Sequence, residues 1–463
     1  MSHFARGTAF AAVCIVTAAP LAAQNRIDEL SPNAPELAEY GPRAVGVRTF
    51  QFTNPDQVDV VNVDPAADPG TPLPRYDRPL TVEMWYPAID GASGDTTLDA
   101  IIRDGVTVVE LQGRAVRDAA PDTSSGAAPL VLMSHGYPGN RYLMSHLAEN
   151  IASKGYVVAS IDHTDSDYVS YRENGGFTFP SFESTLRNRS LDQLFVLDEV
   201  ARLNETPGSD FAGVIDTDTA ALIGYSMGGY GAVVTAGGGL TSEIVDSFWA
   251  PGGTLDIHED GSATHDALPD PRIKTAIAIG PWGRQNDFWD LEGLAGIEIP
   301  MLFMAGSEDG VSQYESGVRR IWEETTSADR SLLTFLGGGH NTIAPMPIPD
   351  EAIGTDMASH YFNDYDGDGI DDTVFMNDVG QHFATAWLDA YLKGDTGAAA
   401  YLDLPMSGTE GWLGFSGNAA DPLRYETLRA GQVAPVPLPA SALLLAAALG
   451  GLGAVRRTRR RAA

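Results

Sequence analysis

One short stretch, Gly224-Tyr225-Ser226-Met227-Gly228, restricts the fold of this chain more than any other part of its sequence. An apolar run (220–223) precedes it, and a run of small residues typical of a helix start (229–235) follows it. The pattern Gly-x-Ser-x-Gly between a strand and a helix predicts a tight turn that lifts the serine hydroxyl to the edge of a sheet. The flanks must be glycine, because a side chain there would meet the neighbouring strand or helix. Without its flanks, the pentapeptide would fit an ordinary glycine-rich turn equally well.

The rest of the chain repeats the alternation of strand and helix. Two half-buried strands are expected at 45–52 and 80–86, and a polar, irregular region with one short strand (106–111) fills 90–128. Further strands are expected at 130–133, 156–161, 219–224, 274–279, 300–304 and 331–335, with helices at 142–153 and 190–204. This order predicts an α/β fold with a mostly parallel central sheet and helices on both faces. The loops after the strands then meet along one edge of the sheet.

Two segments, 165–189 and 241–271, interrupt this alternation. Both would emerge near the same edge, so each is expected either to shape a substrate cleft or to be an ordinary surface loop. His258 and His265 lie in the second segment among aspartates, which favours a solvated surface role for them.

A serine hydroxyl is a poor nucleophile at neutral pH and needs a general base within hydrogen-bond reach. Imidazole suits this task because it titrates near neutrality. Of the nine histidines, His340 has the most suitable setting, since it follows the expected strand 331–335 and three glycines. A loop histidine without chemistry is the alternative interpretation.

The base in turn needs an acid that holds it in one tautomer. A strand at 300–304 runs into a loop that carries Glu308 and Asp309. Asp309 is the preferred candidate because it directly precedes the turn, and Glu308 is the second choice. The chain order Ser226, Asp309, His340 differs from that of both major groups of serine proteases.

A developing oxyanion needs two preorganised N–H donors. The amide of Met227, at a helix N-terminus, is one candidate. The amide of Tyr137, in the loop after the strand 130–133, is the other, because Pro138 has no amide hydrogen to donate. His135, in the same loop, is then interpreted as a structural residue.

Several motifs occur together in the order typical of one superfamily. They are Ser134-His135-Gly136, Gly155-Tyr156, Ile161-Asp162-His163, Gly224 to Gly229, Gly306 to Asp309, and Gly339-His340. Over residues 45–395 the chain resembles the α/β-hydrolases, and most of all the branch with dienelactone hydrolase-like, platelet-activating-factor acetylhydrolase-like and bacterial polyester hydrolase members. The resemblance implies a serine hydrolase that cleaves carboxylic esters through an acyl-enzyme, without a catalytic cofactor.

Trp282 follows Pro281 after the expected strand 274–279, as in the Pro-Trp pair of the polyester hydrolases. The resemblance implies that Trp282 lines the acyl side of the cleft; a plain core position is equally consistent with the sequence. Three features depart from the compact polyester-hydrolase pattern. They are the polar region 90–128, the two interrupting segments and an acidic insert late in the chain (364–372). They leave polymeric substrates open beside small esters.

The acidic insert spaces carboxylates as calcium requires. Calcium takes six to eight hard oxygen ligands, and alternate acidic positions ahead of a glycine turn a short loop around one ion. The expected ligands are Asp364, Asp366, Asp368, Ile370 and Asp372. The run looks like a thrombospondin type 3 or dockerin-type loop, so a structural calcium ion is expected; a solvated acidic turn is the alternative.

The two ends of the chain are expected to be targeting signals rather than parts of the folded domain. Residues 1–23 have the layout of a secretory signal peptide. Residues 24–432 are expected to form one catalytic domain. Residues 433–463 combine Val436-Pro437-Leu438-Pro439-Ala440, an apolar run and an arginine cluster, and they resemble the bacterial sorting signals that exosortases process. That resemblance implies a bacterial protein at the cell surface or outside the cell, with transient membrane association; a plain transmembrane anchor is the alternative.

Composition narrows the classes of partner. The formal net charge is -33, which disfavours nucleic acid and suits a solvated exterior. The single cysteine, Cys14, lies in the expected signal peptide, so the remaining chain can form no internal disulfide. The two resemblances imply, as partners, a small or polymeric ester and the exosortase-type enzyme. An amide or lactone hydrolase, and a non-catalytic surface or matrix protein on the same fold, are the alternatives.

Overall fold

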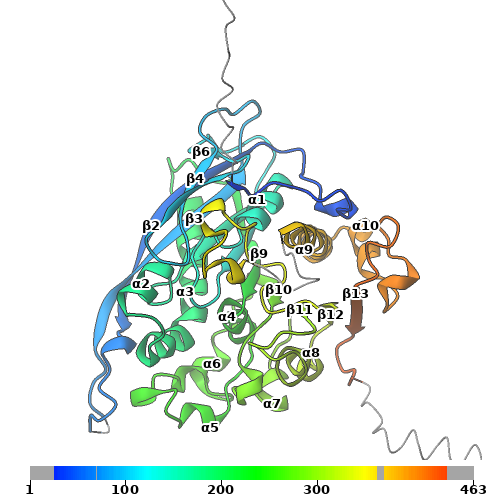
Figure 1. The fold of residues 1–463 in the computed structure, drawn as a ribbon. Helices are drawn as coiled ribbons and strands as arrows, with labels where there is room; N and C mark the ends of the chain where they lie inside the picture. Colours follow the sequence, from blue (N-terminus) through cyan, green and yellow to red (C-terminus); the bar gives the residue numbers. More distant parts are fainter. Residues whose placement is uncertain (1–24, 69, 362–369, 435–463) are drawn as a thin grey trace, which may run out of the picture.

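A ten-stranded sheet runs through the molecule, and helices cover both of its faces (Figure 1). The computed structural model describes residues 25–68, 70–361 and 370–434. The strand order is β13-β12-β11-β10-β9-β7-β8-β3-β2-β6, in which the six strands from β12 to β8 are parallel. Strands β13, β3 and β2 pair antiparallel to their inner neighbours. The predicted α/β class, with a mostly parallel central sheet, is confirmed.

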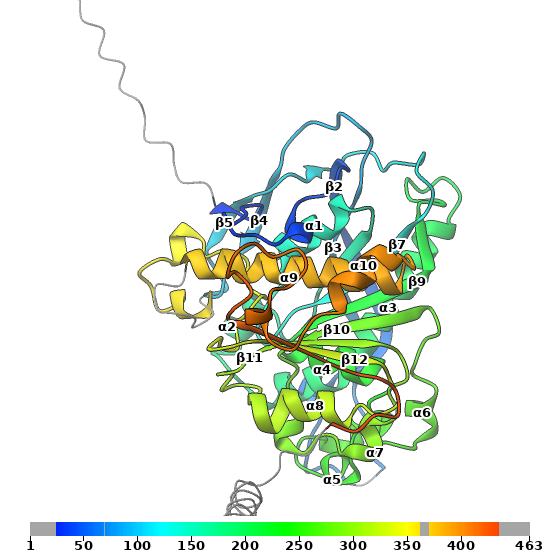
Figure 2. The same cartoon turned by 90° about the vertical axis from the view of Figure 1, so that its right-hand side faces the viewer.

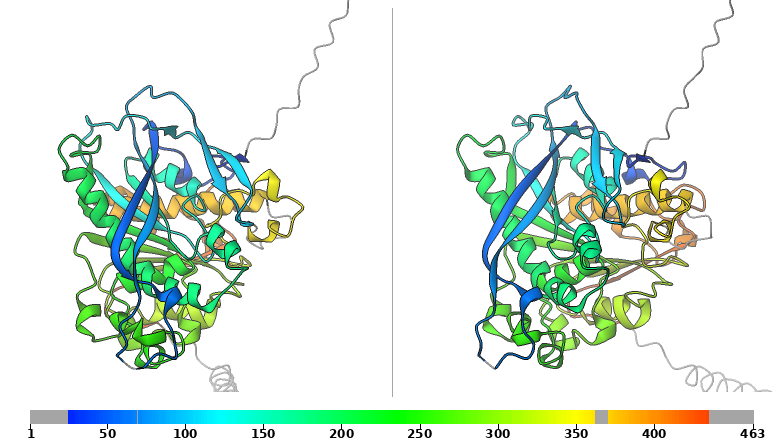
Figure 3. Two further views of the ribbon diagram at one scale, coloured as in Figure 1. Left: turned by 90° about the vertical axis from the view of Figure 1, so that its left-hand side faces the viewer. Right: turned by 60° about the vertical axis from the view of Figure 1, so that its left-hand side comes forward.

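The strands extend most of the predicted runs by a few residues. They are β1 (Asn25–Arg26), β2 (Val45–Val58), β3 (Arg75–Pro87), β4 (Thr97–Ile101), β5 (Val108–Gln112), β6 (Val116–Arg117), β7 (Ala128–Ser134), β8 (Val157–Asp162), β9 (Ile215–Tyr225), β10 (Ile273–Ile279), β11 (Met301–Gly306), β12 (Arg330–Phe335) and β13 (Leu423–Leu428). Strands β1, β5 and β4 form a separate small sheet. Figure 3 shows the long antiparallel pair β2 and β3 along one side of the molecule.

The α-helices are more numerous than the sequence patterns predict. They are α1 (Ser145–Ser153), α2 (Tyr168–Glu173), α3 (Phe179–Glu205), α4 (Met227–Thr235), α5 (Ser242–Val245), α6 (Ala263–Asp266), α7 (Leu291–Leu294), α8 (Arg319–Glu324), α9 (Ile370–Tyr391) and α10 (Thr396–Ala399).

The sheet separates two apolar cores, because successive side chains of a strand point to opposite faces. Along β9, Ala220 and Leu222 belong to one core, and Ala221 and Ile223 belong to the other. Helices α3, α4 and α8 cover the first face, and α1 and α9 cover the second (Figure 2). The continuous apolar runs that predicted these strands are therefore explained by burial on both sides.

The segment 165–189 is largely helical, so a loop there is the wrong expectation. It contains α2 and the first part of α3, which begins at Phe179 rather than near Ser190. The side chain of Thr178 caps α3 by accepting a hydrogen bond from the amide of Ser181, and Pro180 sits in the first turn, where no amide hydrogen is needed.

His258 and His265 are buried, at 0% and 3% exposure, which corrects their expected surface role. Each places its Nε2 on a main-chain carbonyl, that of Arg187 at 2.8 Å and that of Gly237 at 3.2 Å. The imidazole rings thus satisfy carbonyl groups of the helical layer, which the local aspartates do not reveal.

Candidate active site

The turn between β9 and α4 has the strained geometry that its glycines predict. Ser226 occupies it with φ 52° and ψ −111°, a conformation that costs free energy for a residue with a side chain. A Cβ atom added to Gly224 would lie 2.1 Å from the carbonyl oxygen of Gly228, and one on Gly228 would lie 2.0 Å from that of Ser134. Close packing of strand, turn and β7 therefore excludes any other residue at both flanks.

His340 and Asp309 lie beside Ser226 at the same edge of the sheet. The loop after β12 carries His340, and the loop after β11 carries Asp309. Nε2 of His340 is 3.0 Å from Oγ of Ser226, and its Nδ1 is 2.9 Å from Oδ2 of Asp309. Since a carboxylate only accepts, this contact puts the proton on Nδ1 and leaves the Nε2 lone pair facing the serine hydroxyl.

The carboxylate of Asp309 is held from its second oxygen as well. Its Oδ1 accepts hydrogen bonds from the amides of Val311 and Ser312, both at 2.8 Å, and its side chain is 1% exposed. The neighbouring Glu308 is exposed, and among the described residues its side chain accepts no hydrogen bond from His340. The preferred carboxylate of the sequence analysis is thus the one in contact with His340.

The two expected oxyanion donors flank Ser226. Met227 is the first residue of α4, where helix amides have no intrahelical acceptor. Tyr137 lies in the loop after β7 and borders the same cavity as Ser226. The preceding Gly136 touches the nucleophile, because a Cβ atom added to it would lie 3.3 Å from Cβ of Ser226.

A cavity of about 460 Å³ opens onto Ser226 and His340. Its walls come from the loops after β7, β9, β11 and β12, together with residues from α2 and from the segment around His360. The lining residues are Arg103, Tyr137, Pro138, Leu143, Tyr168, Tyr225, Ser226, Glu308, Gly310, Val311, His340, Asn341, Pro345 and His360. A larger cavity, of about 760 Å³, lies against α9 and contains none of these residues.

Trp282 lies next to this cavity in a group of aromatic rings and is not one of its lining residues. Its ring is 5.2 Å from that of Phe182, 5.0 Å from that of Phe288 and 6.2 Å from that of Trp249. Phe182 also contacts Tyr137 at 5.3 Å, so the aromatic group is continuous with the cavity wall.

The same aromatic group reaches the surface. Phe177 and Phe179 are each 50% exposed and Phe248 is 66% exposed, and their rings contact one another or the rings beneath them. We call these three residues the aromatic patch. It comes from the two segments that interrupt the strand–helix alternation, 165–189 and 241–271.

Tyr225 is a site residue that the motif alone does not single out. Its ring lies 5.2 Å from that of His340, and its hydroxyl donates to Oδ1 of Asn341 at 2.9 Å. Burial raises the pKa of Tyr225 well above its ordinary value, so the hydroxyl stays protonated. Its place just before the nucleophile is the signal that could have identified it.

Several expectations fall on other parts of the chain. Outside the described residues lie the expected signal peptide (1–23), the segment 435–463 and three of the expected calcium ligands, Asp364, Asp366 and Asp368. The other two expected ligands, Ile370 and Asp372, fall at the start of α9. Among the described residues, no three histidine, cysteine or acidic side chains gather as metal ligands would. No helix within the described ranges is long and apolar enough to cross a membrane.

Three comparisons with known proteins find related sequences and a similar fold. The family described as platelet-activating factor acetylhydrolase, isoform II, matches residues 82–174. A cutinase from Thermobifida cellulosilytica is 26% identical over 225 residues, which cover 48% of this chain and 63% of the relative. A cutinase from Thermobifida fusca is also 26% identical, over 48% of this chain and 52% of its own length. This chain thus spans less than two thirds of these relatives.

A solved structure described as a ferulic acid esterase from Streptomyces cinnamoneus has the same fold. It superposes with a TM-score of 0.54 at 20% identity, over 85% of this chain and 99% of its own. The sheet order, the strained serine turn and this likeness show that the chain has the α/β-hydrolase fold. The chain is similar to members of the branch that the sequence indicates, through the platelet-activating factor acetylhydrolase match and the cutinase matches.

Proposed function

We propose that this protein hydrolyses carboxylic esters through an acyl-enzyme. The continuous chain of contacts from Asp309 through His340 to Ser226 carries the proposal. The similarity to cutinases supports esters as the substrate class. No catalytic cofactor is needed for this chemistry.

The reaction proceeds in two halves. Ser226 Oγ attacks the ester carbonyl carbon while Nε2 of His340 takes its proton, and Asp309 stabilises the resulting imidazolium. The amides of Tyr137 and Met227 donate to the oxyanion. The tetrahedral species then breaks its bond to the alkoxide, which leaves with the proton from His340.

Water completes the cycle. His340 takes a proton from water as the water oxygen attacks the acyl-enzyme carbonyl. The second tetrahedral species releases Ser226 Oγ, which regains its proton from His340, and the carboxylic acid departs.

An apolar part of the ester lies against the aromatic group that includes Trp282. The contacts from Tyr137 through Phe182 to Trp282 support this assignment, because they connect the cavity with the exposed aromatic patch. Hydrolysis of p-nitrophenyl esters of increasing acyl length should therefore show KM falling as the chain lengthens; a KM independent of length would remove Trp282 from the binding surface.

Replacing Ser226 by alanine tests the function itself. The rate of ester hydrolysis should fall about 10²-fold to 10⁶-fold, to the level left by binding and the oxyanion donors. The protein should remain folded by circular dichroism. A fluorophosphonate probe should label the wild type and not Ser226→Ala; labelling of the variant would exclude Ser226 as the nucleophile.

We further propose that the protein is exported through residues 1–23 and that residues 433–463 are a sorting signal cut by an exosortase-type enzyme. The arginine cluster and the short, alanine-rich apolar run support sorting over a permanent anchor. Mass spectrometry of the protein from its native host should find a C-terminus before Ala442, at the cell surface or in the medium. An intact arginine cluster in the membrane fraction would establish the anchor instead.

A structural calcium ion held by Asp364, Asp366, Asp368, Ile370 and Asp372 completes the proposal. The ion would have no part in the chemistry, because the reaction needs only the serine, histidine and carboxylate described above. The spacing of carboxylates around Gly367 and Gly369 is the observation that supports it.

A further inference from the structure

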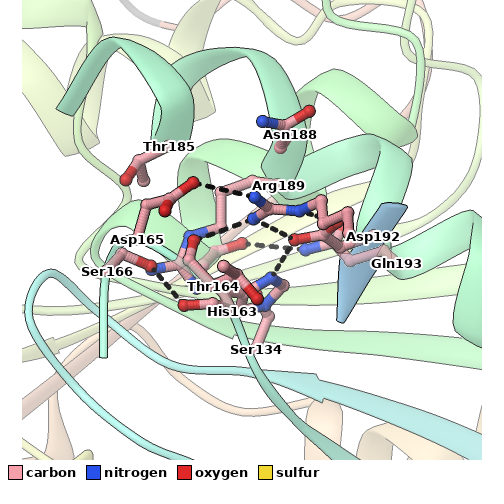
Figure 4. A network of polar contacts seen from close by, with 12 residues as sticks. Ser134, His163, Thr164, Asp165, Ser166, Thr185, Asn188, Arg189, Asp192 and Gln193 are labelled. Carbon is pink, nitrogen blue, oxygen red and sulfur yellow. Dashed lines mark hydrogen bonds and ion pairs between the residues drawn. The ribbon is translucent and has the colours of Figure 1, made fainter. Parts of the chain in front are cut away.

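A buried network of charged and polar side chains joins β3, the end of β7 and helix α3 (Figure 4). Arg78 on β3 is 1% exposed, and its Nε and Nη2 donate to the two oxygens of Asp192 on α3 at 2.8 Å and 3.0 Å. Its Nη1 donates to Asp165 at 2.9 Å. A buried charge is costly unless it is paired, and this ion pair meets that requirement for Arg78 and Asp192.

The network contains a second serine–histidine–aspartate arrangement. Nε2 of His163 is 2.7 Å from Oγ of Ser134, and its Nδ1 is 2.9 Å from Oδ2 of Asp192. Ser134, His163 and Asp192 are each 2% exposed or less, so no substrate reaches the serine. The arrangement is therefore structural, and it fixes the end of β7, where the loop with Tyr137 begins.

His163 also fixes the neighbouring His135. The backbone amide of His163 donates to Nε2 of His135 at 3.2 Å, which leaves the ring proton on Nδ1. That Nδ1 donates to the carbonyl oxygen of Gly136 at 2.7 Å. Burial holds the pKa of both histidines well below the ordinary value, so both rings stay neutral and keep these tautomers.

A second donor reaches the same carbonyl oxygen. Nη2 of Arg189, on α3, donates to the carbonyl of Gly136 and to Oγ of Ser166, both at 2.9 Å. Arg189 is 1% exposed, and its Nε and Nη1 have no hydrogen-bond partner among the described residues. Burial lowers the pKa of its guanidinium to about 9. Among the described residues, Arg189 thus donates only to the Ser166 hydroxyl and to the Gly136 carbonyl, and the carbonyl belongs to the loop that borders the active site.

The carbonyl of Gly136 and the amide of Tyr137 belong to one peptide group. In a trans peptide the C=O and the N–H point in opposite directions, so donors fixed on the oxygen also fix the direction of the N–H. A cation on the oxygen polarises the group and makes the N–H a stronger donor. Because Gly136 packs against Cβ of Ser226, that direction matters at the nucleophile.

We propose that Arg189 is a positioning residue of the oxyanion hole: together with His135 it aims and polarises the Tyr137 amide through the Gly136 carbonyl. The inference rests on the proposed function, since it assigns a support to one of its two oxyanion donors. The other members of the network have a different role, because they hold the end of β7 and the tautomer of His135.

The test replaces Arg189 by glutamine, which removes the charge and shortens the side chain. The kcat for p-nitrophenyl butyrate should fall about 10-fold to 100-fold, less than the loss of a whole oxyanion donor, while KM changes less than about twofold. The affinity for butaneboronic acid, whose adduct with Ser226 is tetrahedral, should fall by a similar factor. Arg189→Lys, which keeps a cation in the same place, should recover most of the boronic-acid affinity.

Arg187→Gln is the matched control. Arg187 lies on the same helix, its pKa is lowered by burial to about 10, and it donates to the carbonyl of Thr254, outside the active-site cavity. It should lower the melting temperature without changing kcat or boronic-acid affinity.

Each outcome has a distinct meaning. Unchanged kcat and boronic-acid affinity in Arg189→Gln, or equal losses in both arginine variants, would overturn the positioning role. If Arg189→Gln does not fold, Arg189→Met, which also removes the charge and keeps an apolar stem, takes its place: kcat and boronic-acid affinity equal to those of Arg187→Gln would likewise overturn the positioning role. Full activity of Ser226→Ala would instead refute the proposed function, whatever Arg189 does.

Discussion

At the scale of single residues, Asp309 and Glu308 differ in what they touch rather than in their chemistry. Asp309→Asn should lower kcat by about 10⁴-fold, because an amide donor facing Nδ1 favours the wrong tautomer of His340. Glu308→Gln should change kcat little, since its side chain is exposed and Nδ1 of His340 is paired with Asp309 instead. Steady-state kinetics on one p-nitrophenyl ester measures both; the opposite ranking would transfer the role to Glu308.

At the scale of elements, Glu149 ties helix α1 to the segment before β6. Its carboxylate is 0% exposed and accepts hydrogen bonds from the amides of Arg114 and Ala115, both at 2.8 Å. Burial raises its pKa from 4.5 to about 7. Between these two values the folded protein binds more protons than the unfolded chain, so the free energy of unfolding falls as pH rises.

Glu149→Gln should flatten that pH dependence. From about pH 4.5 to pH 7 the wild type should lose on the order of 3 kcal/mol of stability relative to the variant, an upper figure for so buried a group. Melting curves at several pH values would show the two melting temperatures drawing together or crossing as pH rises. Glu110→Gln, at an exposed position of β5, is the control; a constant gap between wild type and Glu149→Gln would contradict the prediction.

The elements that the sequence predicts well are those with strong local patterns. Strands β7 to β12 are apolar because both of their faces are buried, and the loops after β9, β11 and β12 carry Ser226, Asp309 and His340 as predicted from local motifs. Each of these three residues can be recognised from a short segment next to a strand end.

The elements that the sequence misses depend on distant partners. Strand β13 is polar on its outer side and is defined by its pairing with β12. The start of α3 follows Gly175-Gly176, and the packing of its Phe182 against Tyr137 and Trp282 is a tertiary effect. Arg78 and Asp192 are separated by 114 residues, so their ion pair leaves no local pattern. Charged residues on the inward face of a long helix, such as Arg189 and Asp192, are the signal that could have found the network.

At the scale of the whole molecule, the net charge of -33 affects how calcium must be tested. A calcium concentration 100-fold above the dissociation constant should add about 2.7 kcal/mol to stability, and the melting temperature should rise accordingly. The rise should vanish in Asp366→Asn/Asp368→Asn, while kcat well below the melting temperature stays constant.

A control separates binding from screening of the acidic surface. Asp216→Asn/Asp218→Asn removes the same charge from strand β9, far along the chain from the acidic insert, and should keep the calcium effect. Equal calcium effects in the two double variants would show that the ion acts only by screening, and a wild-type melting temperature independent of calcium would dismiss the ion altogether.

The position of β13 has a consequence for how the protein is made. This strand, close to the end of the described chain, closes the edge of the sheet beside β12, and the amide of Leu336 donates to the carbonyl of Pro422 just ahead of the loop that carries His340. During synthesis from the N-terminus, that edge of the sheet stays open until the residues of β13 have emerged. The loop that carries His340 is therefore among the last parts of the molecule to gain its neighbours, and the order of synthesis delays the completion of the site.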